Sequence, residues 1–361
     1  MDSRERAFLA VTRQRPDRIP IDFWASPGLL SKLQSETAAS SEEFLESHDV
    51  DFRYIAGPDY IGPPLTSRGP DSVDIWGVPR KLVQVKLRGG IEHYAEVARP
   101  PLADASAVEQ ILAYHHWPSP DWFDYRAIEH QCDQVLRNKR AVVFAGDRLN
   151  RVAQLKPAMY LRGMEQILID MALSPGIAHA IFRKIREFYL AYLEHILEAA
   201  KGKIDIVLTG DDFGAQNGLL VSAATWDEFL SEGFAQYLGL ANSRGAKTMH
   251  HTCGSVAPLI PRMIACGLDV LQSLQPEAQG MRPSDLKAQF GPHIAFHGGV
   301  SIQRTMPFGT REDVHAEVKE LAHTMGEGGG YIFCTAHNLQ ADTPVENVHE
   351  LMAAYHRYGR Y

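Results

Sequence analysis

The chain has 361 residues, of which 45% are hydrophobic and 22% charged, an ordinary globular composition. Its formal net charge is −8 and its lysines and arginines form no cluster, which argues against nucleic acid as a partner. The charged N-terminus leads into no apolar segment and no stretch is apolar for long enough to span a bilayer, so we expect neither a signal peptide nor a transmembrane helix. The four cysteines are then expected as reduced thiols in a cytoplasmic protein.

The first part of the chain predicts a helix, a strand, more helix and then a region broken by turns. Residues 3–14 have helical spacing, 19–24 predict a short strand, and 26–48 are helical and polar. Between residues 49 and 103, Gly-Pro and Gly-Gly pairs interrupt every long element, and only short β segments fit between them. We interpret 49–103 as a β-rich insertion within a single domain that spans residues 1–361.

From residue 104 onward, predicted helices alternate with short apolar strands. Helices are predicted over 104–117, 125–138, 164–173, 176–200, 225–243, 255–266, 283–290, 310–326 and 344–357, and strands over 141–145, 204–209, 247–251, 270–274, 294–297 and 331–333. This alternation predicts parallel βαβ units, and their number favours a closed (β/α)8 TIM barrel over an open doubly wound sheet. No Gly-x-Gly-x-x-Gly follows a first strand, which weakens the dinucleotide-binding form of the open sheet.

The predicted strand ends carry acids, imidazoles, thiols and amides. In a barrel of this class, functional side chains gather at the C-terminal ends of the strands. The residues at those ends are Asp22 and Trp24, Asp147, Asp211 and Asp212, His250, His251 and Cys253, Gln275, His297, and Cys334, His337 and Asn338. We therefore predict a functional site at this rim.

His251 and Cys253 form a His-x-Cys pair where a strand ends, an arrangement that can direct both side chains at one zinc ion. By itself the pair is more typical of a hydrogen-bonded core histidine and a small buried thiol. A second strand end offers Cys334 and His337 as further ligands. Cys334 is nearer the strand and His337 deeper in the loop, where rim residues project. The sequence thus predicts a zinc site with His251, Cys253 and either Cys334 or His337.

Three other residues are predicted to have catalytic roles. Asp211 and Asp212 precede the Gly-containing loop 213–218 and not a helix start, which favours a site role over a capping role. Either carboxylate could also complete the metal coordination, or that position could stay open for substrate. His297 is either a hydrogen-bonded core histidine or a site residue that acts as a general acid/base or as a hydrogen-bond donor to substrate. A serine nucleophile is not indicated, because the sequence has no Gly-x-Ser-x-Gly.

Several segments, in the same order along the chain, resemble the uroporphyrinogen decarboxylase superfamily. They are Arg4–Arg6 with Pro16–Trp24, Gly210–Gln216, His251–Val256, Asp269–Leu271 with Gln275–Pro276, Phe296–Val300, and His337–Gln340 with Thr343–Asn347. The resemblance implies a (β/α)8 barrel with its cleft at the C-terminal rim. True uroporphyrinogen decarboxylases carry Arg-Gln-Ala-Gly-Arg-Tyr near the first strand, and those arginines hold substrate carboxylates. Here that stretch is Phe23–Gly28, so a substrate with many carboxylates lacks this clamp.

The chain is similar instead to the cobalamin- and coenzyme M-linked methyltransferases of the superfamily, which bind zinc through His-x-Cys and a distant Cys. His251 and Cys253 match the pair, but His337 aligns with the distant ligand and Cys334 precedes it. A histidine in place of a thiolate makes zinc a better Lewis acid, which suits an ether or hydroxyl oxygen as leaving group. The resemblance thus implies a zinc-dependent methyltransferase that demethylates a small O-methylated substrate.

The same resemblance implies a corrinoid as methyl acceptor. The chain has no Asp-x-His-x-x-Gly, so the corrinoid is expected on a partner protein. The sequence leaves open whether the chain forms a homodimer. Two other functions also stay open: a metal-free decarboxylase or lyase that holds carboxylates with Arg53, Arg99 or Arg151, and a non-catalytic component that presents a corrinoid to a partner.

Overall fold

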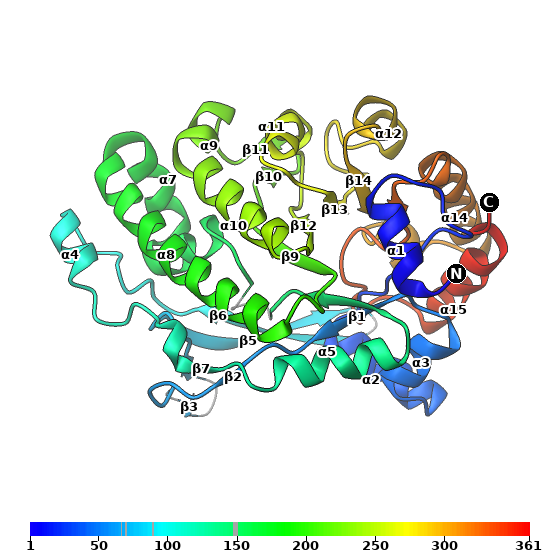
Figure 1. Cartoon of the computed structure of the whole chain (residues 1–361), viewed down its shortest axis with the longest axis horizontal. Coiled ribbons are helices and arrows are strands. Elements are labelled where there is room, and N and C mark those ends of the chain that lie inside the picture. Colours follow the sequence, from blue (N-terminus) through cyan, green and yellow to red (C-terminus); the bar gives the residue numbers. More distant parts are fainter. Residues whose placement is uncertain (66, 69–70, 89, 147–150) are drawn as a thin grey trace.

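The computed structural model describes residues 1–65, 67–68, 71–88, 90–146 and 151–361, so Asp147 lies outside the described residues. Its main sheet has seven parallel strands in the order β1-β8-β9-β12-β13-β14-β15 (Figure 1). These strands are β1 (Phe52–Ile55), β8 (Ala141–Phe144), β9 (Ile206–Gly210), β12 (Lys247–His251), β13 (Val270–Leu274), β14 (Ala295–Gly298) and β15 (Tyr331–Ile332). Each neighbour in this order follows the previous one along the chain, as βαβ units require.

A short segment near the N-terminus closes the sheet between its two edge strands. The backbone N–H of Asp22 donates to the carbonyl of Phe333 at 2.9 Å, and the N–H of Phe333 donates to the carbonyl of Pro20 at 2.8 Å. On the other side, the N–H of Asp51 donates to the carbonyl of Ile21 at 2.9 Å. The segment therefore lies between β15 and β1, in the eighth position, and the predicted (β/α)8 barrel is confirmed.

Helices surround the sheet on its outer side (Figure 1). They are α1 (Ser3–Val11), α2 (Pro27–Thr37), α3 (Ser41–Ser47), α4 (Val108–Leu112), α5 (Ile128–Arg137), α6 (Leu155–Arg162), α7 (Met164–Leu173), α8 (Pro175–Ala200), α9 (Ala223–Phe229), α10 (Ser231–Ser243), α11 (Ile260–Ala265), α12 (Pro283–Phe290), α13 (Thr305–Phe308), α14 (Arg311–Gly326) and α15 (Val345–Tyr358). The longest, α8, buries one face at helical spacing against the barrel. No helix in the described ranges is long and apolar enough to cross a membrane.

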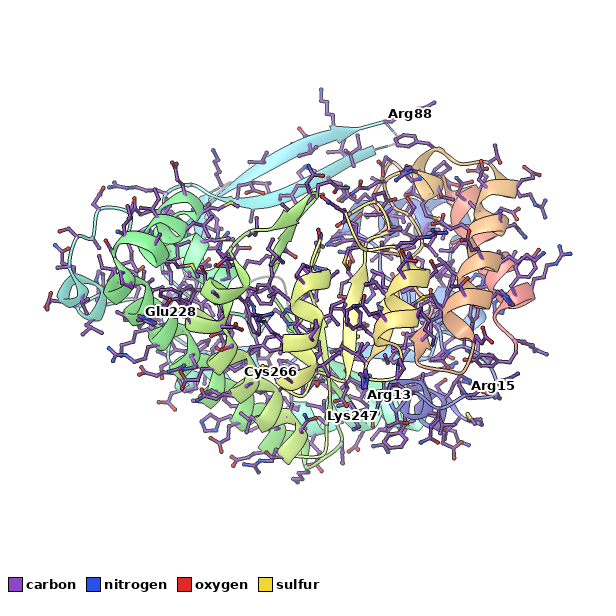
Figure 2. The ribbon with its side chains drawn as sticks, turned by 90° about the horizontal axis from the view of Figure 1, so that it is seen from above. Arg13, Arg15, Arg88, Glu228, Lys247 and Cys266 are labelled. Carbon is purple, nitrogen blue, oxygen red and sulfur yellow. The ribbon has the colours of Figure 1, made fainter. Side chains whose placement is uncertain are left out.

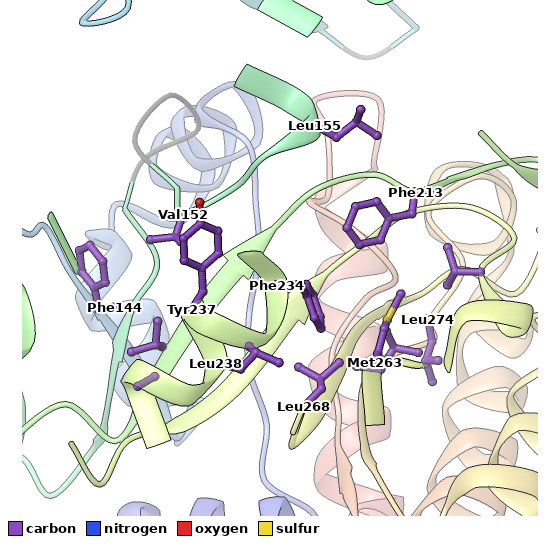
Figure 3. Close-up of a cluster of buried hydrophobic side chains, with 14 of the residues drawn as sticks. Phe144, Val152, Leu155, Phe213, Phe234, Tyr237, Leu238, Met263, Leu268 and Leu274 are labelled. Atoms are coloured by element: carbon purple, nitrogen blue, oxygen red, sulfur yellow. The ribbon is translucent and has the colours of Figure 1, made fainter. Parts of the chain in front are cut away.

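The core has two layers because side chains alternate between the faces of each strand. One face of the strands fills the barrel interior with residues that include Phe52, Val143, Leu208, Met249, Val270, Ala295 and Ile332. The other face packs against the helices, where Phe144, Phe213, Phe234, Tyr237 and Leu238 are among the buried side chains (Figure 3). Two residues beyond Met249, Val270 and Ala295, the same alternation directs His251, Gln272 and His297 into the barrel interior.

The region interpreted as an insertion also contributes to the barrel. Its first strand, β1, pairs in parallel with β8, so the added structure begins only after residue 55. There, β3 (Ser67–Arg68), β4 (Asp71–Val73), β5 (Pro79–Leu87) and β6 (Gly90–Val97) form a four-stranded antiparallel sheet. Two further pairs, β2 (Asp59–Tyr60) with β7 (Phe123–Asp124) and β10 (Gly214–Ala215) with β11 (Gly218–Leu219), are shorter.

The β5–β6 hairpin extends across the molecule, with Arg88 near its tip (Figure 2). At its base, the Arg80 guanidinium lies 4.2 Å from the centroid of the Tyr160 ring on α6. Farther along, the buried Glu92 carboxylate accepts hydrogen bonds from the Ser26 hydroxyl and from the N–H of Ala341, the latter at 3.0 Å. The hairpin therefore connects α6 with the loop that follows β15.

Candidate metal centre

The side chains of His251, Cys253 and His337 meet at the C-terminal rim of the barrel. One ligand atom from each lies within 4.8 Å of those of the other two. The distance from His251 Nε2 to Cys253 Sγ is 3.4 Å. Two ligands held about 2.0–2.3 Å from a tetrahedral zinc ion are roughly 3.5 Å apart, so this spacing fits a shared ion. The donor set, two imidazoles and a thiol, is one that zinc binds.

The orientation of His251 is set by its other ring nitrogen. Nδ1 lies 2.5 Å from Oε1 of Gln272, an atom that only accepts hydrogen bonds, so Nδ1 carries the proton. The lone pair then belongs to Nε2, the atom that faces Cys253. Burial lowers the pKa of His251 well below its ordinary value, so the imidazole is neutral. A neutral imidazole with a free Nε2 lone pair is the form that binds a metal.

The thiol of Cys253 is also largely buried, and burial raises its pKa to about 12. Its backbone continues into Gly254, which has a positive φ of 82° and packs against the backbone of Gly214. A Cβ at Gly254 would come within 2.5 Å of the Gly214 carbonyl carbon, so only glycine allows this approach. The His-x-Cys-Gly sequence is thus a tight turn that presents the thiol at the rim.

The second candidate for the third ligand, Cys334, lies in a different group. Its Sγ, an Asp22 carboxylate oxygen and a His297 ring nitrogen are all within 4.8 Å of one another, and all three residues are buried. The side chain of Cys334 is 1% exposed, and burial raises the pKa of its thiol well above the ordinary value. The structure thus places His337, and not Cys334, beside His251 and Cys253.

The buried Asp22 carboxylate is the centre of a hydrogen-bond cluster. Its Oδ2 accepts from the Tyr54 hydroxyl at 2.5 Å, from Nε1 of Trp24 at 3.0 Å and from Nε2 of His297 at 2.9 Å. The Trp24 ring in turn stacks on His251, with centroids 5.9 Å apart and planes 21° apart. Tyr54 was not predicted as a site residue. The alternation of β1, which directs Phe52 and Tyr54 into the barrel, was the signal in the sequence.

Asp211 and Asp212 have different surroundings. Asp211 accepts hydrogen bonds from the backbone N–H groups at 154, 155 and 156, at 2.6–3.0 Å, and so anchors the start of α6. Burial raises the pKa of Asp211 to about 6 against the effect of these donors. Asp212 is nearer the candidate ligands: its Oδ1 lies 3.6 Å from His251 Nε2 and accepts from the N–H of Cys253 at 3.1 Å.

A cation keeps Asp212 ionised. The ammonium of Lys156 lies 2.8 Å from its Oδ2. Burial opposes the charged form, but the charge and hydrogen bond of Lys156, with the N–H of Cys253, hold the pKa of Asp212 well below the ordinary value of a carboxyl. His250, the neighbour of His251, points to the helix side instead, where its ring stacks on Phe213 at 5.2 Å. Burial lowers the pKa of His250 to about 3.

Only one of the three arginines considered as carboxylate clamps lies near these residues. Arg53 is buried on the outer side of β1 and pairs with Glu42 and Glu46. Arg99 is exposed and pairs with Asp104. The guanidinium of Arg151 lies 5.6 Å from the centroid of Trp24, at the rim.

The fold and its rim define a (β/α)8-barrel protein with a His/Cys/His cluster at the catalytic end. The model of the uroporphyrinogen decarboxylase (URO-D) family matches residues 152–358, and the chain belongs to this family of enzymes. This match confirms the resemblance seen in the sequence. It spans every candidate ligand of the metal centre, together with Asp211, Asp212 and His297.

The curated relatives include both uroporphyrinogen decarboxylases and methyltransferases. The uroporphyrinogen decarboxylase of Anaeromyxobacter dehalogenans (strain 2CP-C) is 26% identical over 198 residues, which are 55% of this chain and 53% of that protein. The methylcobamide:CoM methyltransferase MtaA of Methanosarcina barkeri is 26% identical over 175 residues, 48% of this chain and 46% of that protein. The chain thus spans about half the length of the curated relatives it matches.

Among solved structures, a methyltransferase from Methanosarcina mazei aligns with a TM-score of 0.67 at 17% sequence identity, over 99% of both chains. At this identity the likeness shows that the whole chain shares the fold of that protein. The choice between decarboxylase and methyltransferase chemistry therefore depends on the residues at the rim.

Proposed function

We propose that the protein is a zinc-dependent methyltransferase that moves a methyl group from a small, O-methylated substrate to a corrinoid carried by a partner protein. The observation that carries the proposal is the cluster of His251, Cys253 and His337, whose ligand atoms all lie within 4.8 Å of one another. The 3.4 Å separation of Nε2 and Sγ and the hydrogen bond from His251 Nδ1 to Gln272 support metal binding.

In this proposal zinc would be held by His251, Cys253 and His337, and as a Lewis acid it would polarise the oxygen from which the methyl group departs. An ether oxygen carries no hydrogen and gains a proton as the methyl group leaves, so the ionised Asp212 beside this position would hold the ammonium of Lys156 as the hydrogen-bond donor to the leaving oxygen. Lys156 keeps Asp212 charged, and Trp24 forms an aromatic wall over His251. Asp211 acts through α6, because its carboxylate fixes the position from which Lys156 extends.

The corrinoid acceptor is supported by the relative named methylcobamide:CoM methyltransferase. The preference for an oxygen leaving group rests on His337, which gives the site one thiolate and two imidazoles. Fewer thiolates leave the metal more electrophilic and so favour activation of an ether oxygen over that of a thiol. The corresponding assay supplies a methoxylated aromatic compound and reduced free cobalamin and follows methylcobalamin by its absorbance.

Metal analysis tests the proposal directly. Protein purified without added zinc should retain close to one equivalent, and Cys253→Ala should lose it, because one ligand of the three is gone. The matched control is Cys266→Ala, which removes a partly buried thiol far from the rim and should keep the metal. Wild-type protein with less than about a tenth of an equivalent, unchanged in Cys253→Ala, would contradict the proposal.

One observation favours a second candidate, a metal-free decarboxylase. Arg151 lies at the rim over Trp24 and offers a guanidinium for a substrate carboxylate. Turnover of a carboxylated substrate that persists in a chelator and falls in Arg151→Gln would support this alternative. Activity that disappears on chelation and returns with added zinc would exclude it.

A further inference from the structure

A row of buried polar side chains crosses the barrel interior from the candidate metal centre to Asp22. His251, Gln272 and His297 are Cα partners on the neighbouring strands β12, β13 and β14. Residues paired in this way on parallel strands point to the same face of the sheet. All three side chains are fully or almost fully buried, with exposed fractions of 2%, 0% and 0%.

The two ends of the row are already bonded. At one end, Nδ1 of His251 donates to Oε1 of Gln272. At the other end, Nε2 of His297 lies 2.9 Å from Oδ2 of Asp22. That oxygen also receives the Tyr54 hydroxyl and the Trp24 indole N–H, so it acts as an acceptor. His297 must therefore donate from Nε2, and in the neutral ring this leaves a lone pair on Nδ1.

The middle of the row contains two complementary atoms without partners. Among the described residues, the amide nitrogen of Gln272 has no acceptor and Nδ1 of His297 has no donor, although both atoms are buried. Buried polar groups nearly always have partners. The amide N–H of Gln272 is a donor and the Nδ1 lone pair of His297 is an acceptor. A hydrogen bond between them would therefore give both atoms a partner.

These hydrogen bonds fit only one orientation of the Gln272 amide. If the Gln272 amide turned over, its oxygen would face the His297 lone pair and its N–H groups would face the Nδ1 proton of His251. The Asp22 carboxylate therefore selects the tautomer of His297, His297 selects the orientation of the Gln272 amide, and the amide selects the tautomer of His251. The last step leaves the His251 lone pair on Nε2, beside Cys253.

We propose that Asp22, His297 and Gln272 form a positioning row that holds His251 in its metal-binding tautomer, with the amide of Gln272 bonded to Nδ1 of His297 directly or through one water. The inference rests on the proposed zinc site and adds the residues that orient one of its ligands. His297 is then a positioning residue, and it contacts neither the metal nor the substrate.

Zinc affinity, measured by competition with a chromophoric chelator, tests the row with the metal alone. Gln272→Met keeps the side-chain volume but removes both hydrogen bonds, and His297→Leu removes the Nδ1 acceptor. Each should weaken zinc binding by about 10- to 100-fold. His297→Asn places an oxygen acceptor near the position of Nδ1 and should stay within about threefold of wild type. The control Gln154→Met removes a similarly buried amide, which within the described part of the chain donates to the Leu230 carbonyl, and should not change the affinity.

The double variant Gln272→Met/His297→Leu shows whether the two side chains affect zinc binding through one connected row or independently of each other. In a connected row, the second substitution adds little to the first, because the path is already broken. Losses that multiply would overturn the proposal, as would a loss in His297→Asn equal to that in His297→Leu. Thermal unfolding of each variant shows whether the fold is intact.

A second readout does not depend on the metal. Histidine ¹⁵N chemical shifts distinguish the two neutral tautomers, and metal-free wild-type protein should show His251 protonated at Nδ1 and His297 at Nε2. In Gln272→Met, His251 should shift to a mixture of tautomers while His297 stays unchanged. If wild-type protein binds no zinc but these shifts are observed, the proposed function fails and the row stands. If His251 keeps its tautomer in Gln272→Met, the row fails.

Discussion

His337 stands where the resemblance expects a cysteine, and the position of β15 explains why the sequence could not choose between it and Cys334. The strand ends at Ile332, which points into the barrel, so alternation directs Cys334 inward as well, toward Asp22 and His297. His337 comes later, in the loop that passes over the rim, and its ring meets His251 edge to face at 5.3 Å. Where a strand ends decides this geometry, and strand ends are set by tertiary pairing that local sequence does not encode.

The identity of the third ligand can be tested by exchanging the donor atom. We expect His337→Ala to weaken metal binding by about two orders of magnitude or more and His337→Cys to retain it, because a thiolate is an equally good zinc ligand. With cobalt(II) in place of zinc, the thiolate charge-transfer absorption of His337→Cys should be about twice that of wild type, as the thiolates increase from one to two. Cys334→Ala serves as the control. Loss of metal in Cys334→Ala with retention in His337→Ala would contradict the assignment.

The residue types at the rim were predictable, and their roles were not. His251, Cys253, Asp212 and His297 were identified from strand ends alone. The sequence could not show that Asp211 fixes a helix start or that His297 faces Asp22, because those partners are distant along the chain. The ligand set, the zinc and the corrinoid partner stay predictions.

At the scale of elements, prediction succeeded where the signal is local. The strands 247–251 and 270–274 and the helix 283–290 were placed to the residue, because each is an apolar or amphipathic run between turn residues. Among the elements that the sequence analysis missed, β1 and α6 lack such a local signal. In β1, Arg53 interrupts the apolar pattern, and its charge is met by Glu42 and Glu46 on α3. Helix α6 has no side-chain cap of its own, and its cap is Asp211.

The contact between α3 and α15 predicts a pH dependence of stability. His48, at the end of α3, lies against the Phe44 ring at 4.5 Å and the His356 ring at 5.8 Å. Burial, and then the neighbouring His356 and His349, lower the pKa of His48 to about 4. In the unfolded chain a histidine has a pKa of about 6.5. Between these values the unfolded state binds the extra proton, so the stabilisation is present above pH 6.5 and is lost as the pH falls toward 4.

We therefore expect the free energy of unfolding, measured in urea, to decrease as the pH falls from about 6.5 to 4. In His48→Gln this decrease should be smaller by on the order of 1 kcal/mol, because the ring is partly exposed and solvent screens its charge. His130→Gln, at an exposed position, should leave the pH dependence as in wild type. A pH profile of His48→Gln that superimposes on the wild-type profile would show that this contact does not titrate.

At the scale of the whole molecule, the barrel is closed by a segment of irregular backbone, and one buried carboxylate holds it in place. Asp51 has no exposed surface and immediately precedes β1. Its oxygens accept hydrogen bonds from Arg6 on α1 at 2.6 Å, from Arg18 at 2.7 Å and from the N–H of Ile21 at 2.8 Å. Asp51 thus joins α1, the closing segment and the edge of the sheet at the end opposite the metal centre.

Removing that charge should weaken the closure of the barrel and leave the rim intact. Asp51→Asn removes the fully buried charge between two guanidinium groups and leaves them with the more exposed Asp17 and Asp49. We expect the free energy of unfolding to fall by about 3 kcal/mol, the lower end for a broken buried pair. Asp104→Asn, which breaks the exposed pair with Arg99, should have no measurable effect. Folded Asp51→Asn protein should still bind zinc with the wild-type stoichiometry. Asp51 lies at the end of the barrel where the strands begin, and His251 lies where β12 ends. Equal stability of the two variants would mean that backbone pairing alone closes the barrel.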